Sequence, residues 1–144
     1  MTTTDTNAKK PTVGHIGIIV ADIDEAVAQF GRLLGIAPSE RTDLPHVGVR
    51  IAMIETANVT LELVQHTGEG GRGREITGSA VGINHISLNV DDLGDSIAAM
   101  EAAGANTKPG FPIQGAHGQV AFFEPESTSG LLLEICEPDR DHKA

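Results

Sequence analysis

The sequence has no tryptophan or tyrosine, a single cysteine and no long apolar segment. Without tyrosine, no phenol can act as a catalytic acid. The lone Cys136 excludes an internal disulfide and fits a reducing compartment. No apolar run approaches the roughly 20 residues of a membrane span, and the first residues lack the apolar core of a signal peptide. These absences lead us to expect a cytoplasmic protein.

Positive charge is also scarce, with 10 Lys and Arg against 20 Asp and Glu and a net charge of −10. Nucleic-acid phosphates and anionic membrane surfaces repel such a chain, so we expect neither as a partner. The length of 144 residues suits a single domain with a real core. We expect disordered tails at residues 1–12 and 139–144.

What the chain does contain is a duplication. The stretch VGHIGIIVADID, which begins at Val13, returns as INHISLNVDDLG from Ile83. A second pair, TLELVQ at 60–65 and LLEICE at 132–137, follows in the same order. Two copies indicate duplicated halves rather than a solenoid. We therefore divide the chain into a first module at 13–65, a glycine-rich linker at 66–82 and a second module at 83–138.

Both halves follow the same order of predicted elements. Each begins with alternating apolar residues typical of a strand, and then a helical stripe runs from an Asp N-cap to a Gly. We expect later strands at 47–55, 59–65, 119–123 and 131–137, with a further short strand near 37–43. The linker has six glycines and no periodicity. The pattern predicts an α+β fold made of two tandem β-α-β-β-β modules.

One histidine and one glutamate in each half stand on the strand face opposite the core-facing residues. A lone histidine of this kind is more often a hydrogen-bonded core residue than a metal ligand. Here, however, the same pair occurs twice at almost the same separation, and an unpaired buried carboxylate is costly. Two imidazoles and two carboxylates suit a divalent ion such as Co, Ni, Mn, Zn or Mg, with open positions for substrate oxygens. The four predicted ligands are His15, Glu62, His85 and Glu134. Three other histidines lack this paired context, and we expect them at the surface: His46, His66 and His142.

These features resemble the vicinal-oxygen-chelate (glyoxalase/bleomycin resistance) superfamily, and within it the methylmalonyl-CoA epimerases. The resemblance rests on GHIGIIVADIDEAV, on NHISLNVDD and above all on GAHGQVAFFEPESTSGLLLEICEP at 115–138. It covers residues 13–138. It implies a half-barrel cleft, the same four metal ligands, and a homodimer, since the family usually pairs and exposed sheet edges need cover.

The resemblance implies a metal-dependent epimerase or racemase that removes the proton alpha to a thioester carbonyl. The metal-chelated enolate would be stabilised by the ion as a Lewis acid, and the substrate would be a small acyl-CoA. Epimerisation needs proton transfer on both faces of the carbon. Some relatives have a catalytic Glu where this chain has Ile51. We therefore expect Glu134 to be the first base, with Glu62 and His117 as the other catalytic candidates.

Two alternatives remain open. A glyoxalase-like lyase or isomerase for a smaller oxygen-chelating substrate would share the His, Glu, His, Glu set, and the acidic charge and Glu126 at the family's usual lysine position favour it. Arg72 and Arg74 in the linker are candidates for contacts with an anion, and the alternative is that they are an exposed, solvated pair. The other alternative is a non-catalytic, drug-sequestering protein, although such proteins commonly lose the four ligands.

Overall fold

The computed structural model describes residues 10–68 and 72–140, with eight strands, three α-helices and a short 3-10 helix at Pro125–Ser127. In the first half the elements are β1 (Thr12–Ile19), α1 (Ile23–Leu34), β2 (Glu40–Leu44), β3 (Val49–Glu55) and β4 (Thr60–His66). Helix α2 (Arg72–Thr77) connects the halves. The second half contains β5 (Gly82–Asn89), α3 (Leu93–Ala102), β6 (Ile113–Gln114), β7 (Gly118–Phe122) and β8 (Leu133–Pro138).

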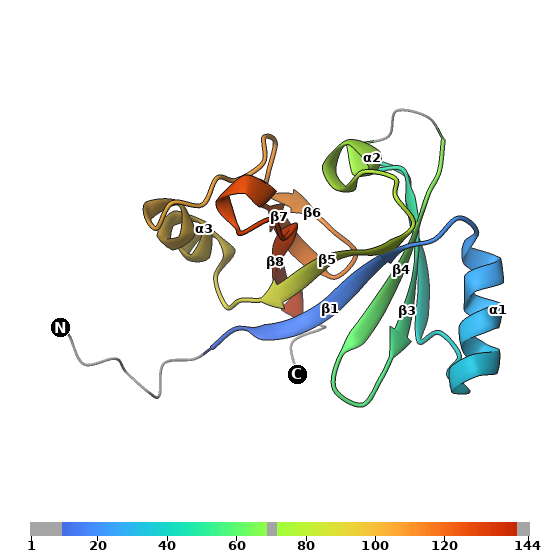
Figure 1. Ribbon diagram of the computed structural model, residues 1–144. Helices are drawn as coiled ribbons and strands as arrows, with labels where there is room; N and C mark the ends of the chain where they lie inside the picture. Colours follow the sequence, from blue (N-terminus) through green and yellow to red (C-terminus); the bar gives the residue numbers. More distant parts are fainter. Residues whose placement is uncertain (1–9, 69–71, 141–144) are drawn as a thin grey trace.

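All eight strands belong to one curled sheet in the order β2-β3-β4-β1-β5-β8-β7-β6. Strand β1 is parallel to β4, β5 is parallel to β8, and the antiparallel β1–β5 pair joins the two halves at the middle. Figure 1 shows the halves diverging from β1 and β5, with α1 and α3 on the outside. The expected α+β fold of two β-α-β-β-β modules that form a half-barrel is confirmed.

The two long helices begin in the same way. The Asp22 and Asp92 carboxylates each accept a hydrogen bond from the backbone three residues later, as expected for an N-cap. A second side chain from the last strand of each half, Gln65 or Glu137, accepts the backbone N–H of the first helical residue at 2.8 Å. The repeated sequence thus seats each helix on the strand that carries a predicted ligand.

Apolar residues divide between the two faces of the sheet. On the outer face α1 packs over a cluster that includes Ala52, Ile54 and Leu63, and α3 packs over one that includes Phe123 and Ile135. The inner face holds a separate apolar cluster, which consists of Ile19, Val47, Val49, Ile51, Met53 and Val64. The helices cover only the outside, so the inner face is left to line a cavity.

The predicted boundaries need three corrections. The stretch 66–82 is not a plain linker, because it contains α2 and its end residues belong to β4 and β5. At the end of this helix Gly78 N–H donates to Arg74 O, four residues earlier. The helix is too short to show a hydrophobic period in the sequence, which is why it was not predicted. Thr12 lies in β1, and Asp139 N–H donates to His117 O at 2.7 Å, so neither belongs to a disordered tail. Residues 1–9 and 141–144, with His142, lie outside the described part.

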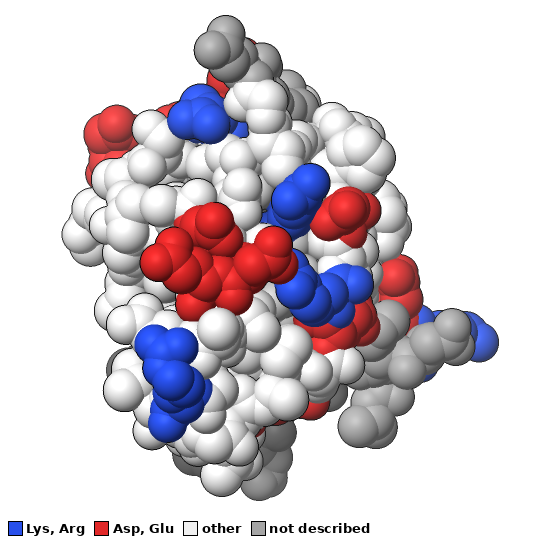
Figure 2. Space-filling view, turned by 90° about the vertical axis from the view of Figure 1, so that its right-hand side faces the viewer, with Lys and Arg blue, Asp and Glu red and all other residues white. Residues whose placement is uncertain are grey.

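The surface over α1 carries acidic and basic side chains side by side (Figure 2). One such contact is the Arg41–Asp24 ion pair, 2.6 Å long, between β2 and the first turn of α1. Pairs this exposed contribute little to stability. In residues 10–68 and 72–140, no helix is long and apolar enough to cross a bilayer.

Candidate active site

A cavity of about 500 Å³ lies against the inner face of the sheet. Its wall combines the apolar inner cluster with residues of β7, β8, the β6–β7 loop and helix α2. Gly73, Ile76 and Thr77 of α2 lie at its edge. Both halves of the duplication therefore contribute to one shared chamber.

Strand register brings the four predicted ligands into this cavity. Gly17 on β1 pairs with Glu62 on β4 and with His85 on β5. His15 pairs with Ser87 on β5, which in turn pairs with Glu134 on β8. Residues paired across strands point to the same face. The four side chains therefore stand on four adjacent strands in the middle of the sheet.

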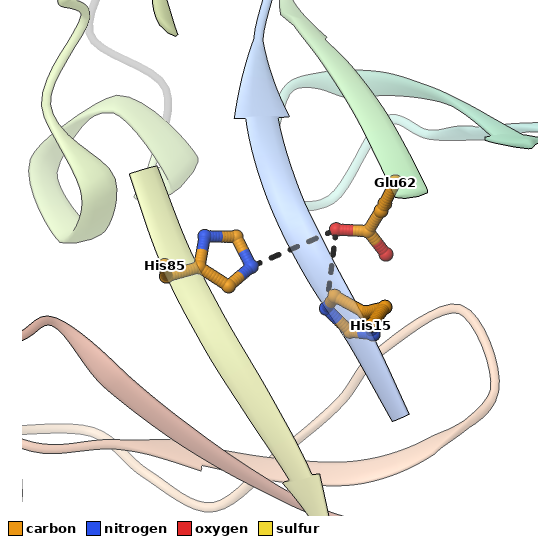
Figure 3. Close-up of side chains that lie close together, drawn as sticks. All are labelled: His15, Glu62 and His85. Carbon is orange, nitrogen blue, oxygen red and sulfur yellow. Dashed lines mark ion pairs between the residues drawn. The ribbon is translucent and has the colours of Figure 1, made fainter. Parts of the chain in front are cut away.

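Figure 3 shows the imidazoles of His15 and His85 turned toward the carboxylate of Glu62. The Nε2 atoms lie 3.5 Å and 3.8 Å from Glu62 Oε1, and one ligand atom from each residue falls within 4.8 Å of the other two. Glu134 Oε1 approaches the same two nitrogens at 2.9 Å from His15 and 3.7 Å from His85. All four groups thus surround one point.

The hydrogen bonding of these groups fits a cation at that point. Among the described residues, five buried polar side-chain atoms lack a well-directed hydrogen bond, and three of them are His15 Nε2, His85 Nε2 and Glu134 Oε1. Buried polar groups are nearly always paired, and the 2.9 Å contact of His15 with Glu134 is poorly directed for a hydrogen bond. Imidazole nitrogens and carboxylate oxygens are ligands of Zn²⁺ and related divalent ions.

Without an ion, a proton takes over part of this role. Burial alone lowers the pKa of His15, but the negative charges of Glu62 and Glu134 outweigh it and raise the pKa to about 9. Burial raises the pKa of Glu134, yet the histidines nearby, His15 first, lower it below its ordinary value. At neutral pH the site therefore holds a carboxylate beside an imidazolium. A divalent ion that binds there can replace the proton of the imidazolium.

Three neighbours hold the His85 ring in place. Asn84 Nδ2 donates to Thr77 O at 2.8 Å, so its Oδ1 is turned to accept from His85 Nδ1 at 2.8 Å. That bond leaves the lone pair of a neutral ring on Nε2, the atom at the centre of the site. A Cβ on Gly17 would come within 2.1 Å of the ring, so only glycine leaves room for it. Phe122 packs edge-on at 5.2 Å between ring centres.

The other predicted residues have different surroundings. His117 lines the cavity, and its Nε2 lies 2.8 Å from Oε2 of Glu40. The sequence did not predict Glu40 as a site residue. It lies on the edge strand β2, whose apolar alternation is too weak to indicate which way each side chain points. Ile51 is buried in the inner apolar cluster. Cys136 also lines the cavity, but burial first, and then nearby carboxylates, raise its thiol pKa to about 12, which makes it a poor nucleophile.

His66, predicted at the surface, is half-buried and faces the cavity. Its ring lines the cavity, and Nε2 contacts the carbonyl of Gly78 at 2.8 Å and Thr77 Oγ1 at 3.2 Å. Burial is the main cause that lowers its pKa. Helix α2, absent from the prediction, is what folds back over His66. His46 is exposed as expected, and Arg74 is exposed as well.

Comparison with known proteins places the chain in a family. Residues 14–123 match the profile of the Glyoxalase/Bleomycin resistance protein/Dioxygenase superfamily. The chain is 34% identical over 127 residues to the ethylmalonyl-CoA/methylmalonyl-CoA epimerase of Cereibacter sphaeroides, which covers 85% of this chain and 95% of that one. It is 30% identical over 129 residues to the uncharacterized protein YqjC of Bacillus subtilis, covering 88% and 92%.

A solved structure has the same fold. A variant of Streptomyces coelicolor methylmalonyl-CoA epimerase in complex with 2-nitronate-propionyl-CoA superposes with a TM-score of 0.79 at 23% identity, covering 94% of this chain and 100% of that one. The duplicated modules and the sheet order indicate the same fold family as the matched profile. This chain belongs to the Glyoxalase/Bleomycin resistance protein/Dioxygenase superfamily and is a methylmalonyl-CoA epimerase-like member of it.

Proposed function

We propose that this protein is a metal-dependent isomerase that epimerises the carbon alpha to a thioester carbonyl, with methylmalonyl-CoA as its first substrate to test. The observation that carries the proposal is the convergence of His15, Glu62, His85 and Glu134 on one point of a cavity, with three of their atoms lacking a well-directed hydrogen bond. The 34% identity to an ethylmalonyl-CoA/methylmalonyl-CoA epimerase over most of both chains supports the substrate class.

The four residues at the floor of the cavity would hold the divalent ion. An ion bound there would act as a Lewis acid on substrate oxygens and stabilise the charge of the enolate. Glu62 and Glu134 are buried, so they would shield an ion held there from bulk water. Gly17, Asn84 and Phe122 would keep the His85 ring in its ligating orientation.

Glu134 is the first choice for the base that removes the alpha proton. Its Oε1 lies between the two imidazoles and lacks a well-directed hydrogen bond. Its lowered pKa keeps it ionised at neutral pH, as a base must be. Glu62 is the second carboxylate within reach of the same nitrogens, and it is the alternative base if Glu134 serves only as a ligand.

One observation favours a second candidate function. No Lys or Arg lines the described part of the cavity, so no cation there meets the phosphates of a CoA. A glyoxalase-like lyase or isomerase that acts on a smaller oxygen-chelating substrate would not need one. A non-catalytic, drug-sequestering protein is the weaker candidate because all four ligands are present. The homodimer and the cytoplasmic location stay predictions.

Metal analysis followed by deuterium exchange tests the proposal. Purified protein should contain about one divalent ion per chain, and in D₂O it should introduce solvent deuterium at the alpha carbon of methylmalonyl-CoA. Glu134→Gln should slow this exchange by about 10²–10⁴ when compared at metal saturation, with metal content measured beside the rate, the usual effect of losing a general base. Turnover of a glutathione hemithioacetal without exchange in methylmalonyl-CoA would favour the glyoxalase-like function. Absence of both would leave a binding protein.

A further inference from the structure

Epimerisation requires a second proton-transfer group on the face of the carbon that Glu134 does not reach. Ile51, on the inner face of β3, is apolar and buried among Val49, Met53 and Val64. Besides the four candidate ligands, Glu40 and His117, the described cavity lining holds three titratable side chains, Glu55, His66 and Cys136. Glu55 is exposed, His66 Nε2 contacts Gly78 O and Thr77 Oγ1, and the Cys136 thiol has a raised pKa. Glu40 and His117 remain as the pair best placed to supply the second group.

The other side of the chamber is where the two edges of the sheet meet. The ligands stand on β4, β1, β5 and β8, the four middle strands, whereas β2 and β6 are the two edges. The edges nevertheless touch, since His46 Nε2 lies 3.2 Å from Gln114 O and His117 Nε2 lies 2.8 Å from Glu40 Oε2. In a curled sheet whose edges touch, the edges lie across the enclosed space from the middle strands. Glu40 and His117 therefore form a roof opposite the ligand floor.

Register confirms that Glu40 faces the cavity. Glu40 pairs with Met53, and Met53 pairs with Glu62, so all three side chains point to the same side of the sheet. At a strand spacing of about 4.8 Å, Glu40 starts roughly 10 Å from Glu62 along the sheet. Both Glu40 and His117 line the cavity, whereas His46 does not.

The two side chains form a partly buried and well-supported pair. Their exposed fractions are 25% for His117 and 38% for Glu40. Thr42 Oγ1 also donates to Glu40 Oε2 at 2.9 Å. The loop that carries His117 is held by Gly115 N–H, which donates to Gly118 O at 2.7 Å, and by Asp139 N–H, which donates to His117 O at 2.7 Å. A group held this firmly can present a proton at a defined position.

The chemistry of the pair suits proton transfer. An ionised carboxylate only accepts hydrogen bonds, so His117 Nε2 would carry its hydrogen toward Glu40, and Nδ1 would be the atom that exchanges a proton with the substrate. Glu40 balances the charge of the imidazolium that results. This is the arrangement in which a carboxylate orients a histidine that acts as general acid and base.

We propose that His117, held by Glu40, is the second proton-transfer group, acting on the substrate face opposite Glu134. This inference rests on the proposed function. In one direction the alpha proton moves to Glu134, the C–H electrons pass into the enolate, and His117 then gives its proton to the opposite face of the carbon as those electrons form the new C–H bond. In the other direction His117 accepts the proton and Glu134 donates one.

The test uses each methylmalonyl-CoA epimer separately in D₂O, with the metal-loaded full chain. The wild-type protein should label and invert both epimers. His117→Gln, which keeps an amide near Glu40 but cannot carry a proton, should slow inversion by about 10²–10⁴. One epimer should still exchange its alpha proton with retention through Glu134, and the other should not exchange. Metal content and melting temperature should match the wild type.

His46→Gln is the matched control, because His46 also joins the two edges but does not line the cavity. It should keep inversion and both exchanges. Glu40→Gln should lower kcat about tenfold with KM unchanged, whereas Asp43→Asn on the same strand should change neither.

Two results would overturn the inference alone. The first is a wild-type protein that inverts methylmalonyl-CoA and a His117→Gln variant whose inversion rate is within threefold of the wild-type rate. The second is an equal loss of inversion rate in His117→Gln and His46→Gln, which would mean that the two histidines only hold the edges together. A wild-type protein that neither labels nor inverts methylmalonyl-CoA would overturn the proposed function and this inference together.

Discussion

The two halves of the chain agree closely at the floor of the cavity and differ at its rim. Each half supplies a His, a Glu and an Asp N-cap. In each half the residue three positions after the Glu, Gln65 or Glu137, also accepts a hydrogen bond from the first residue of the helix. At the rim, β2 has five residues and β6 only two. Glu40 comes from a strand and His117 from a loop, and neither has a counterpart in the other half. Duplication thus retained the His and Glu pair on the inner face of each half, while the rim diverged.

Even the two candidate histidine ligands are held differently. His85 is almost fully buried, with 3% of its side chain exposed, and Asn84, Phe122 and the space over Gly17 define its position. His15 is 15% exposed, and its contacts in the site are to the two carboxylates and the edge of His85. The equivalence of the two halves in sequence therefore does not imply equal rigidity.

The largest effect should come from removing a ligand. His85→Ala should lower metal affinity by at least about a hundredfold, more than removal of a residue that only orients a ligand. It should also lower the melting temperature of metal-loaded protein, since saturation at 100 times the Kd contributes about 2.7 kcal/mol. Elemental analysis and calorimetry measure both. His15→Ala should lose metal too, and full metal content in either variant would contradict the ligand assignment.

The small residues beneath the two histidines offer the next comparison. Gly17 pairs with His85 and Ser87 pairs with His15. Gly17→Ser should displace the His85 ring and cost about 1–3 kcal/mol, a typical penalty for overpacking, with loss of metal. Ser87→Gly should cost about 1 kcal/mol and keep the metal. Chemical denaturation with metal analysis decides this, and metal retained by Gly17→Ser would refute the steric argument.

Removing the orienting amide should have a smaller effect. Asn84→Ala frees the His85 ring and unlinks it from Thr77 at the end of α2. We expect metal affinity to fall about 10–100-fold, as is usual for residues that orient a ligand. Calorimetric titration measures this, with Asn58→Ala in the exposed β3–β4 turn as the control. Equal affinities in the two variants would show that Asn84 has no positioning role.

Metal affinity should also depend on pH because of His15. The two carboxylates, against the effect of burial, raise the His15 pKa to about 9, so an ion that binds below that pH must displace a proton. Affinity should therefore rise with pH toward about 9, by at most about tenfold per unit, and level off above it. Proton release measured in two buffers of different ionisation enthalpy gives an independent value. Affinity that stays constant from roughly pH 7 to 9 would contradict the assigned proton.

The smallest expected effect concerns the second helix caps. Gln65→Ala and Glu137→Ala should each cost about 1 kcal/mol of unfolding free energy, because each removes a 2.8 Å acceptor from a helix N-terminus. Glu137 also carries a negative charge near that end, so its loss should cost a few tenths of a kcal/mol more. Thermal unfolding of both variants makes the comparison. A neutral effect in one half only would show that the halves are not equivalent here.

The sequence by itself determined the repeated features. Alternation in strands has a period of two, so the positions of His15 and Glu62 relative to Ile18 and Leu63 already indicated which face each side chain occupies. The Asp N-caps and the spacing of His and Glu are local or duplicated signals that need no tertiary information. This is why the two-module fold and the convergence of the four residues could be predicted.

Only the tertiary structure decided the rest. Curling of the sheet brings Glu40 to His117, which is 77 positions away, and no local pattern records that meeting. Helix α2 has six residues, too few for an amphipathic period to be visible, yet it covers His66 and holds Asn84. Contacts across the open edges of a curled sheet depend on how far it curls, and that is set by packing along the entire chain rather than by any one segment.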